Sequence, residues 1–188
     1  MSTQTLLLGQ TFEATGNPFT GPWEEAVRVN STGAVLLENG LIEALGDAAL
    51  LRKAHPDAKV IDYGRHLICP GFIDAHVHYP QTAIIASWGK RLIDWLNTYT
   101  FPEEMRFGDP DHAARTAATY LDLALDNGTT TVCSYATIHP GSVDAFFEAA
   151  LARKLRVVAG KTCMDRNAPE GLRDTARSAR DDATSRTA

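Results

Sequence analysis

The chain has 188 residues, of which 44% are hydrophobic and 8% aromatic, and its 18 basic and 23 acidic side chains give a net charge of −5. This content of apolar side chains argues against disorder over most of the length, because it supplies enough surface to bury. The acidic balance, without any run of Lys or Arg, gives no electrostatic reason to expect nucleic acid or an anionic membrane as a partner.

The sequence predicts neither a membrane span nor a secretory signal. Its apolar stretches are a few residues long, far short of the roughly 20 that cross a bilayer, and residues 1–5 lack the basic region of a signal peptide. Cys69, Cys133 and Cys163 occur singly, without CxxC spacing, so a reducing cytosol is the default compartment. We therefore expect a cytoplasmic protein. Its length also matters, since a closed α/β barrel needs about 250 residues.

Residues 1–66 are predicted to form a small β-rich module. Short apolar runs are broken by glycine, and Asn39-Gly40 between two such runs is typical of a tight hairpin turn, because both turn positions require a positive φ. Residues 47–55 could form a short helix that ends before Pro56.

From residue 67 onward the pattern changes to alternating strands and helices. Apolar residues recur at helical spacing over residues 109–127 and 141–151, while β-branched and apolar runs begin near residues 68, 129 and 155. This order, β-α-β-α-β, predicts parallel strands joined by crossover helices over residues 67–178.

The end of the chain has a different composition. Residues 165–188 include ten charged side chains and no aromatic residue, and Leu172 is the one large aliphatic side chain among them. We expect this segment to add almost nothing to a core and to be mobile or, at most, an exposed helix. Residues 179–188 form its divergent polar tail.

His76-Val77-His78 directly follows a strand-like run and is the strongest chemical signal in the sequence. Residues i and i+2 of a strand point to the same face, so both imidazoles could reach one metal ion. Zinc, iron and nickel all accept imidazole, so the pair does not select the metal. The alternative is a pair without a ligand. Asp74 could orient a ligand or serve as a turn residue.

Several separated segments resemble known families. Residues 69–78, Cys-Pro-Gly-Phe-Ile-Asp-Ala-His-Val-His, resemble the PGFxDxHxH signature of the amidohydrolase superfamily, metal-dependent hydrolases on a (β/α)8 barrel preceded by a small β-sandwich. Residues 78–82, 95–104 and 161–169 resemble the guanine deaminase family within it. The resemblance implies an α/β fold: a β-sandwich module followed by an incomplete TIM-like (β/α)8 barrel with its first three strands.

The resemblance also implies a reaction and a site. It implies hydrolysis of guanine to xanthine and ammonia by a zinc-activated water, with His76 and His78 as the first two zinc ligands. Residues His78, Tyr79, Pro80 and Gln81 would line the purine pocket. Gln81 would hydrogen-bond the base, a role that suits an amide because it offers both a donor and an acceptor. The full-length enzyme is expected to be a homodimer.

Other parts of the family pattern do not occur in these residues. They are two further metal-binding histidines, an HxxE motif with the catalytic glutamate, and a late aspartate. We therefore expect an N-terminal fragment that ends soon after the third of eight strands, by truncation or frameshift, contains no catalytic group and is inactive alone. The alternatives are another metal hydrolase, such as a phosphoesterase barrel that also opens with HxH, and a non-catalytic short form that pairs with full-length subunits.

Secondary roles are expected for several further residues. Lys161 is a weak candidate for a modified lysine ligand, and Cys163 is expected to be a small buried hydrophobe. His139 is more consistent with a turn than with the site. Four aromatic residues are expected to pack the core or a lid over the site: Trp88, Trp95, Tyr99 and Phe101.

Overall fold

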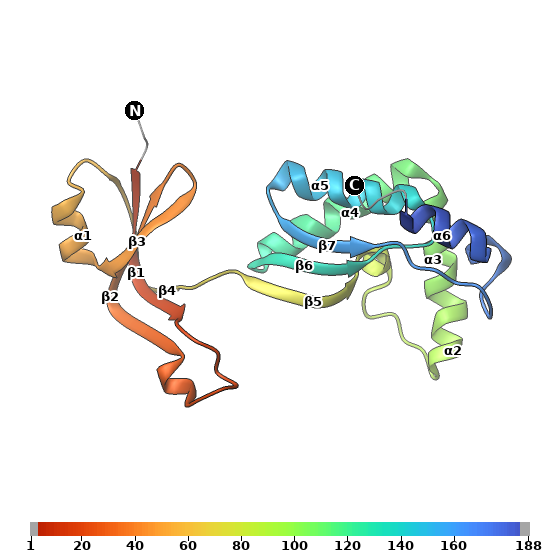
Figure 1. Ribbon diagram of the computed structural model, residues 1–188, viewed down its shortest axis with the longest axis horizontal. Coiled ribbons are helices and arrows are strands. Elements are labelled where there is room, and N and C mark those ends of the chain that lie inside the picture. Colours follow the sequence, from red (N-terminus) through yellow and green to blue (C-terminus); the bar gives the residue numbers. More distant parts are fainter. Residues whose placement is uncertain (1–3, 185–188) are drawn as a thin grey trace. The chain divides into compact units, whose positions relative to one another are not determined.

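The computed structural model describes residues 4–184, and it divides into two compact units with the boundary between Pro70 and Gly71 (Figure 1). The sequence places this boundary at residue 67. The difference arises because Leu67 and Ile68 still pair with Gln10 and Thr11 of the first unit. No helix in the described part of the chain is both long and apolar enough to cross a membrane.

The first unit is a four-stranded sheet with the order β3-β2-β1-β4. Its strands are β1 (Gln4–Ala14), β2 (Val27–Glu38), β3 (Leu41–Asp47) and β4 (Lys59–Ile68), and η1 (Trp23–Glu25) precedes β2. Strands β2 and β3 form the hairpin expected at Asn39-Gly40, whose φ angles are 52° and 81°. Helix α1 (Ala48–Ala54) is capped by Asp47, whose carboxylate accepts hydrogen bonds from two backbone N–H groups of the first turn.

The second unit is built on a three-stranded parallel sheet with the order β5-β6-β7. Strands β5 (Phe72–His78), β6 (Thr129–Tyr135) and β7 (Arg156–Gly160) are joined by crossovers that contain α4 (Pro110–Asp126) and α5 (Pro140–Arg153). The two helices contact each other along the sheet (Figure 1). This arrangement confirms the expected α/β class and the β-α-β-α-β order. Gly71 precedes β5 where a Cβ atom would overlap the Thr130 side chain.

The core of the second unit lies between the sheet and these helices. It contains Tyr79, Phe107, Leu121, Val132 and Phe146, none of them more than 1% exposed. Tyr79 therefore belongs to the core by burial, and its ring stacks on Phe146 with 4.7 Å between the ring centroids.

A long helical excursion connects β5 to α4. It consists of η2 (Tyr79–Ile84), α2 (Leu92–Trp95), the π-helical η3 (Leu96–Thr100), α3 (Phe101–Met105) and η4 (Arg106–Gly108). Pro102 explains the change of helix type, because proline has no N–H to donate and its ring collides with the carbonyl of the preceding turn.

The polar end of the chain departs from expectation at Leu172. Leu172, in η5 (Glu170–Leu172), is fully buried and packs with Phe101 and Ala168, so this segment does contribute to a core. The following helix α6 (Ala176–Thr184) agrees with the exposed helix allowed for this segment, and residues 185–188 lie outside the described residues. Cys163, expected to be buried, is exposed, as are Cys69 and Cys133.

Candidate active site

The two histidines of the HxH motif lie at the carboxyl end of β5. Their ring centroids are 5.5 Å apart, and both rings contact Tyr135 at the end of the neighbouring β6. The pairing of β5 with β6 is irregular between Asp74 and Val77, where two residues of β5 face one of β6. Such bulges redirect side chains at strand ends, and His76 lies within this one.

The geometry of the pair fits one metal ion. Two imidazoles bound to one tetrahedral zinc at about 2.1 Å place their ring centroids about 5 Å apart, close to the separation of His76 and His78. Burial lowers the pKa of His78, and the neighbouring His76 adds to this effect. The lowered pKa favours the neutral imidazole, which is the form that binds a metal. Among the described residues, no group of three or more His, Cys, Asp or Glu is placed to hold a metal.

The sequence leaves open whether Asp74 orients a metal ligand or shapes the backbone, and the structure shows its contact with the backbone. Its Oδ1 accepts a hydrogen bond of 3.1 Å from the backbone N–H of His76, so this carboxylate stabilises the backbone at the bulge. No imidazole N–H donates a hydrogen bond to Asp74 among the described residues. Asp74 itself lies within β5, so its observed role is to hold the backbone at the bulge.

A cavity of about 260 Å³ opens beside His78. Its walls combine an imidazole, an amide and hydroxyls with aliphatic and aromatic side chains: Val77, His78, Gln81, Thr82, Ile84, Ile85, Ala86, Ser87, Trp95 and Tyr120. Burial, with a smaller contribution from Asp74, raises the pKa of Tyr120 to about 12, so its hydroxyl stays protonated. A cavity with apolar walls and few polar groups is typical of a small-molecule site.

The structure brings together only part of the expected pocket segment, residues 78–81. His78 and Gln81 line the cavity, whereas Tyr79 and Pro80 are fully buried in the protein. The Tyr79 hydroxyl donates a 2.5 Å hydrogen bond to the Ser142 carbonyl. The reason is the helix type of η2, which has three residues per turn. Residues 78, 81 and 84 therefore share the cavity side with Thr82, while Tyr79 and Pro80 face the core and Ala83 is exposed.

Gln81 is held by a residue that sequence reasoning did not select. Its Nε2 donates a 3.3 Å hydrogen bond to Oε1 of Glu104 in α3, a residue only 7% exposed. Burial raises the pKa of the Glu104 carboxyl, and the hydrogen bond from Gln81 partly opposes this. The sequence does not indicate whether Glu103 or Glu104 contacts Gln81, because Gln81 comes from a separate element, η2.

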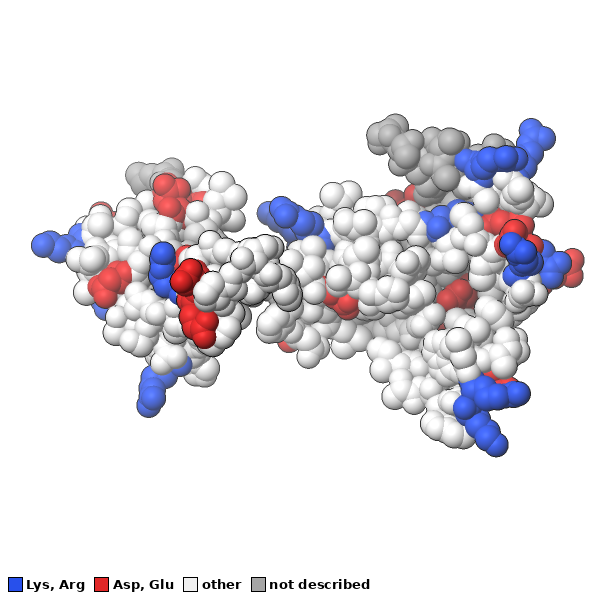
Figure 2. All heavy atoms as spheres, turned by 60° about the horizontal axis from the view of Figure 1, so that its bottom comes forward, with Lys and Arg blue, Asp and Glu red and all other residues white. Residues whose placement is uncertain are grey.

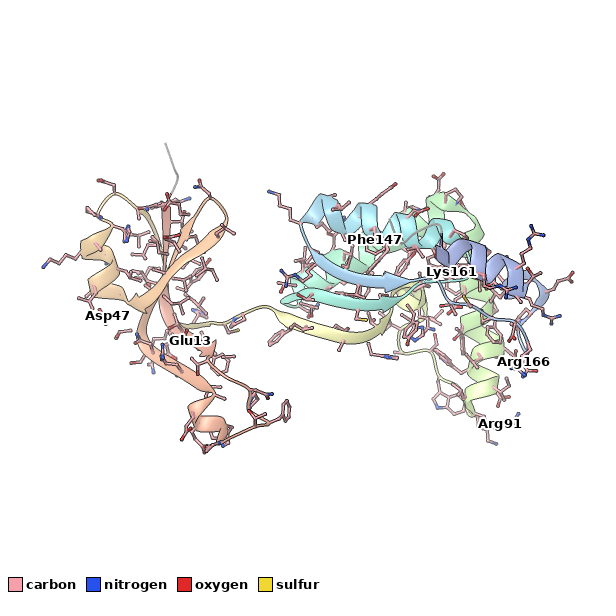
Figure 3. All side chains as sticks on the ribbon, in the orientation of Figure 1. Glu13, Asp47, Arg91, Phe147, Lys161 and Arg166 are labelled. Atoms are coloured by element: carbon pink, nitrogen blue, oxygen red, sulfur yellow. The ribbon has the colours of Figure 1, made fainter. Side chains whose placement is uncertain are left out.

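The ends of β6 and β7 hold further polar side chains near the same edge of the sheet. Lys161 follows β7, where Figure 3 labels it, and its Nζ lies 2.6 Å from Oδ2 of the equally buried Asp174. This ion pair explains Lys161 without a modification. His139 precedes α5 and does not line the cavity, in agreement with a turn role.

The four aromatic residues expected to pack a core or lid have different environments. Trp95 lines the cavity, and Trp88 is 76% exposed. Tyr99 is half-buried in η3, and Phe101 packs with Leu172. On the face that Figure 2 shows, acidic and basic side chains lie in small groups, several of which contain both signs.

Comparison with known proteins relates this architecture to a family. Residues 67–187 match the family model described as "Amidohydrolase family", and residues 33–58 match an imidazolonepropionase-like composite domain of bacteria. Guanine deaminase of Escherichia coli (strain K12) is 44% identical over 154 residues, which are 81% of this chain and 35% of that protein. The chain therefore spans about a third of the length of this curated relative.

Solved structures show the same likeness over nearly the whole chain. Guanine deaminase from Bradyrhizobium japonicum superposes with a TM-score of 0.89 and 32% identity, covering 97% of this chain and 40% of that one. Guanine deaminase from C. acetobutylicum, solved with guanine bound in its active site, superposes with a TM-score of 0.83 and 25% identity, covering 97% and 42%.

Proposed function

Because the chain belongs to the amidohydrolase family, we propose that it forms the amino-terminal part of a metal-dependent guanine deaminase, which converts guanine and water to xanthine and ammonia. The observation that carries this proposal is the cavity that joins His78 of the HxH pair to the amide of Gln81. The identity of 44% to a guanine deaminase supports the substrate. The proposal extends to a zinc cofactor, a cytoplasmic location and a homodimer of the full-length enzyme.

His76 and His78 would hold the metal, which lowers the pKa of a water molecule and so supplies a nucleophile at neutral pH. The residues around the pair prepare it for this role. Burial keeps His78 neutral, and the ring of Tyr135 stacks on its imidazole at 4.8 Å between centroids, which limits its rotation. The bulge at the end of β5 sets the direction of His76.

The cavity walls would bind and orient the base. Trp95, Ile84 and Ile85 provide apolar surface for a flat aromatic ring, and excluding water strengthens the polar contacts that remain. Gln81 would hydrogen-bond one edge of the purine. Displacing the amine also requires a carboxylate for proton transfer, and we propose that this group and the remaining metal ligands come from residues beyond these 188, since the relative is longer.

The experiment measures guanine turnover by the protein from the complete gene, purified with zinc. We expect stoichiometric xanthine and ammonia, and loss of at least two orders of magnitude in kcat for His76→Ala and His78→Ala. His66→Ala is the matched control, because His66 is exposed and belongs to the first unit. Activity that survives both substitutions, or turnover of a phosphodiester in place of guanine, would contradict the proposal.

A second measurement uses the 188-residue chain alone. We expect weak zinc binding that disappears in His76→Ala, and no ammonia release, because catalytic zinc sites use three protein ligands and the HxH pair supplies two. Release of ammonia from guanine by this chain would overturn that expectation. Size-exclusion chromatography of the same sample tests the non-catalytic alternative, which predicts a uniform dimer.

A further inference from the structure

Gln81 lies in the cavity wall, and its amide is held from outside the cavity by Glu104. The two residues are 23 positions apart and come from η2 and α3, which pack against each other. Glu104 is 7% exposed and is not one of the lining residues. The contact therefore joins a wall residue to a buried carboxylate behind it.

The adjacent glutamate serves a different purpose. Glu103 lies 2.7 Å from Arg106 of η4 and 2.9 Å from Nε2 of His112 in α4, so it has partners of its own. Gln81 is the one hydrogen-bond partner of the Glu104 side chain among the described residues. Burying a carboxylate beside a neutral amide costs stability. The contact with the Gln81 amide gives the buried Glu104 carboxylate a role that accounts for this cost.

The chemistry of the pair determines which way the amide faces. An ionised carboxylate only accepts hydrogen bonds, whereas a glutamine amide has an NH2 group at one corner and a carbonyl oxygen at the other. The ionised Glu104 therefore accepts from Nε2, as in the 3.3 Å contact. The carbonyl oxygen is left at the other corner, and no protein group donates to it within the described residues.

We propose that Glu104 is a positioning residue that fixes the Gln81 carbonyl oxygen toward the cavity, so that this side chain selects a ligand offering an N–H group. The identity of that ligand rests on the proposed function, in which guanine offers N–H groups on its rings and its exocyclic amine. Glu104 itself does not touch the ligand. Its effect on recognition passes entirely through Gln81.

The first test does not depend on any enzymatic activity. The chain has three glutamines, Gln4, Gln10 and Gln81, so side-chain amide signals in a ¹⁵N-labelled sample can be assigned with Gln81→Ala. We expect Glu104→Met to shift the Gln81 amide signal to that of a free amide and Glu103→Gln to leave it unchanged. Gln4, which donates to Glu38 at 2.9 Å, is the internal reference. An unmoved Gln81 signal in Glu104→Met would overturn the positioning role.

The second test is a double-mutant cycle in the protein from the complete gene. We expect Glu104→Met to raise the KM for guanine about tenfold, equivalent to about 1.4 kcal/mol, with kcat changed less than threefold. In the Gln81→Ala background the same substitution should change KM no further. Independent, multiplying effects would overturn the proposal. If the amide signal shifts but guanine is not turned over, the proposed function fails and the positioning role stands.

Discussion

Tyr79→Phe removes one hydroxyl from the core of the second unit and separates two readings of this residue. The resemblance implies that Tyr79 lines the purine pocket, whereas in the structure the side chain is fully buried and donates its hydroxyl to the Ser142 carbonyl. Burial also raises the pKa of Tyr79 above its ordinary range, so the hydroxyl stays a donor at any working pH. We expect a loss of stability without a loss of ligand affinity.

The size of the effect follows from what the substitution deletes. The ring and its contacts with Phe146 and Phe107 remain, so no cavity forms. One buried hydrogen bond is lost, which is worth about 1 kcal/mol. For a unit of roughly 120 residues this corresponds to a fall in Tm of about 4 °C. Tyr79→Ala, which also deletes the ring, should cost about 3 to 5 kcal/mol.

The assay is urea unfolding followed by circular dichroism, combined with guanine KM for the protein from the complete gene. Tyr63→Phe is the matched control, because Tyr63 lies in the first unit and is 46% exposed. It should leave the unfolding of the second unit unchanged. The reasoning is refuted if Tyr79→Phe leaves stability intact while KM for guanine rises severalfold.

Three further predictions concern stability. Ser142→Ala should lower the free energy of unfolding by about 2 to 3 kcal/mol, because the Ser142 hydroxyl accepts from the backbone N–H of the fully buried Thr137 at 3.1 Å and donates to the His139 carbonyl at 2.7 Å; exposed Ser31→Ala, measured by the same urea titration, should be neutral. Leu172→Ala should cost about 2 to 5 kcal/mol, against a negligible effect of Leu151→Ala at a site 75% exposed; equal effects would show that the end of the chain is not part of a core. Because burial raises the pKa of Glu104 in the folded state, its contribution is most favourable below the ordinary glutamate pKa of about 4.3 and is lost as pH rises through the raised value. The stability of the wild type relative to Glu104→Gln should therefore fall as pH rises above about 4.3, and a constant difference would contradict this.

Much of the fold could be predicted from local patterns. The hairpin at Asn39-Gly40 and the alternation of strands and helices after residue 70 depend on turn chemistry and periodicity, which act over a few residues. The burial of Leu172 could not be predicted in this way. Its partner Phe101 is 71 positions away, and nothing in the composition of the polar segment indicates that contact.

The sequence also predicts the residues of the candidate site that follow from local spacing, but not those that depend on tertiary packing. The HxH spacing predicts two imidazoles on one strand, and the structure places both against Tyr135. The resemblance predicts a pocket segment, but the helix type of η2 decides which of its side chains reach the cavity. Glu104 could not be identified, because its role depends on how α3 packs against η2.

Because η2 has three residues per turn, its length determines both which side chains form the cavity wall and which one packs in the core. Residues on one side of this short helix form the cavity wall, and Tyr79 on the other side belongs to the core. Adding or removing a single residue after Tyr79 would rotate the later side chains of η2 by about a third of a turn and move Gln81 and Ile84 off the cavity side. Substituting a wall residue therefore changes the cavity alone, whereas changing the length of this segment alters the cavity wall and the core contact of Tyr79 together.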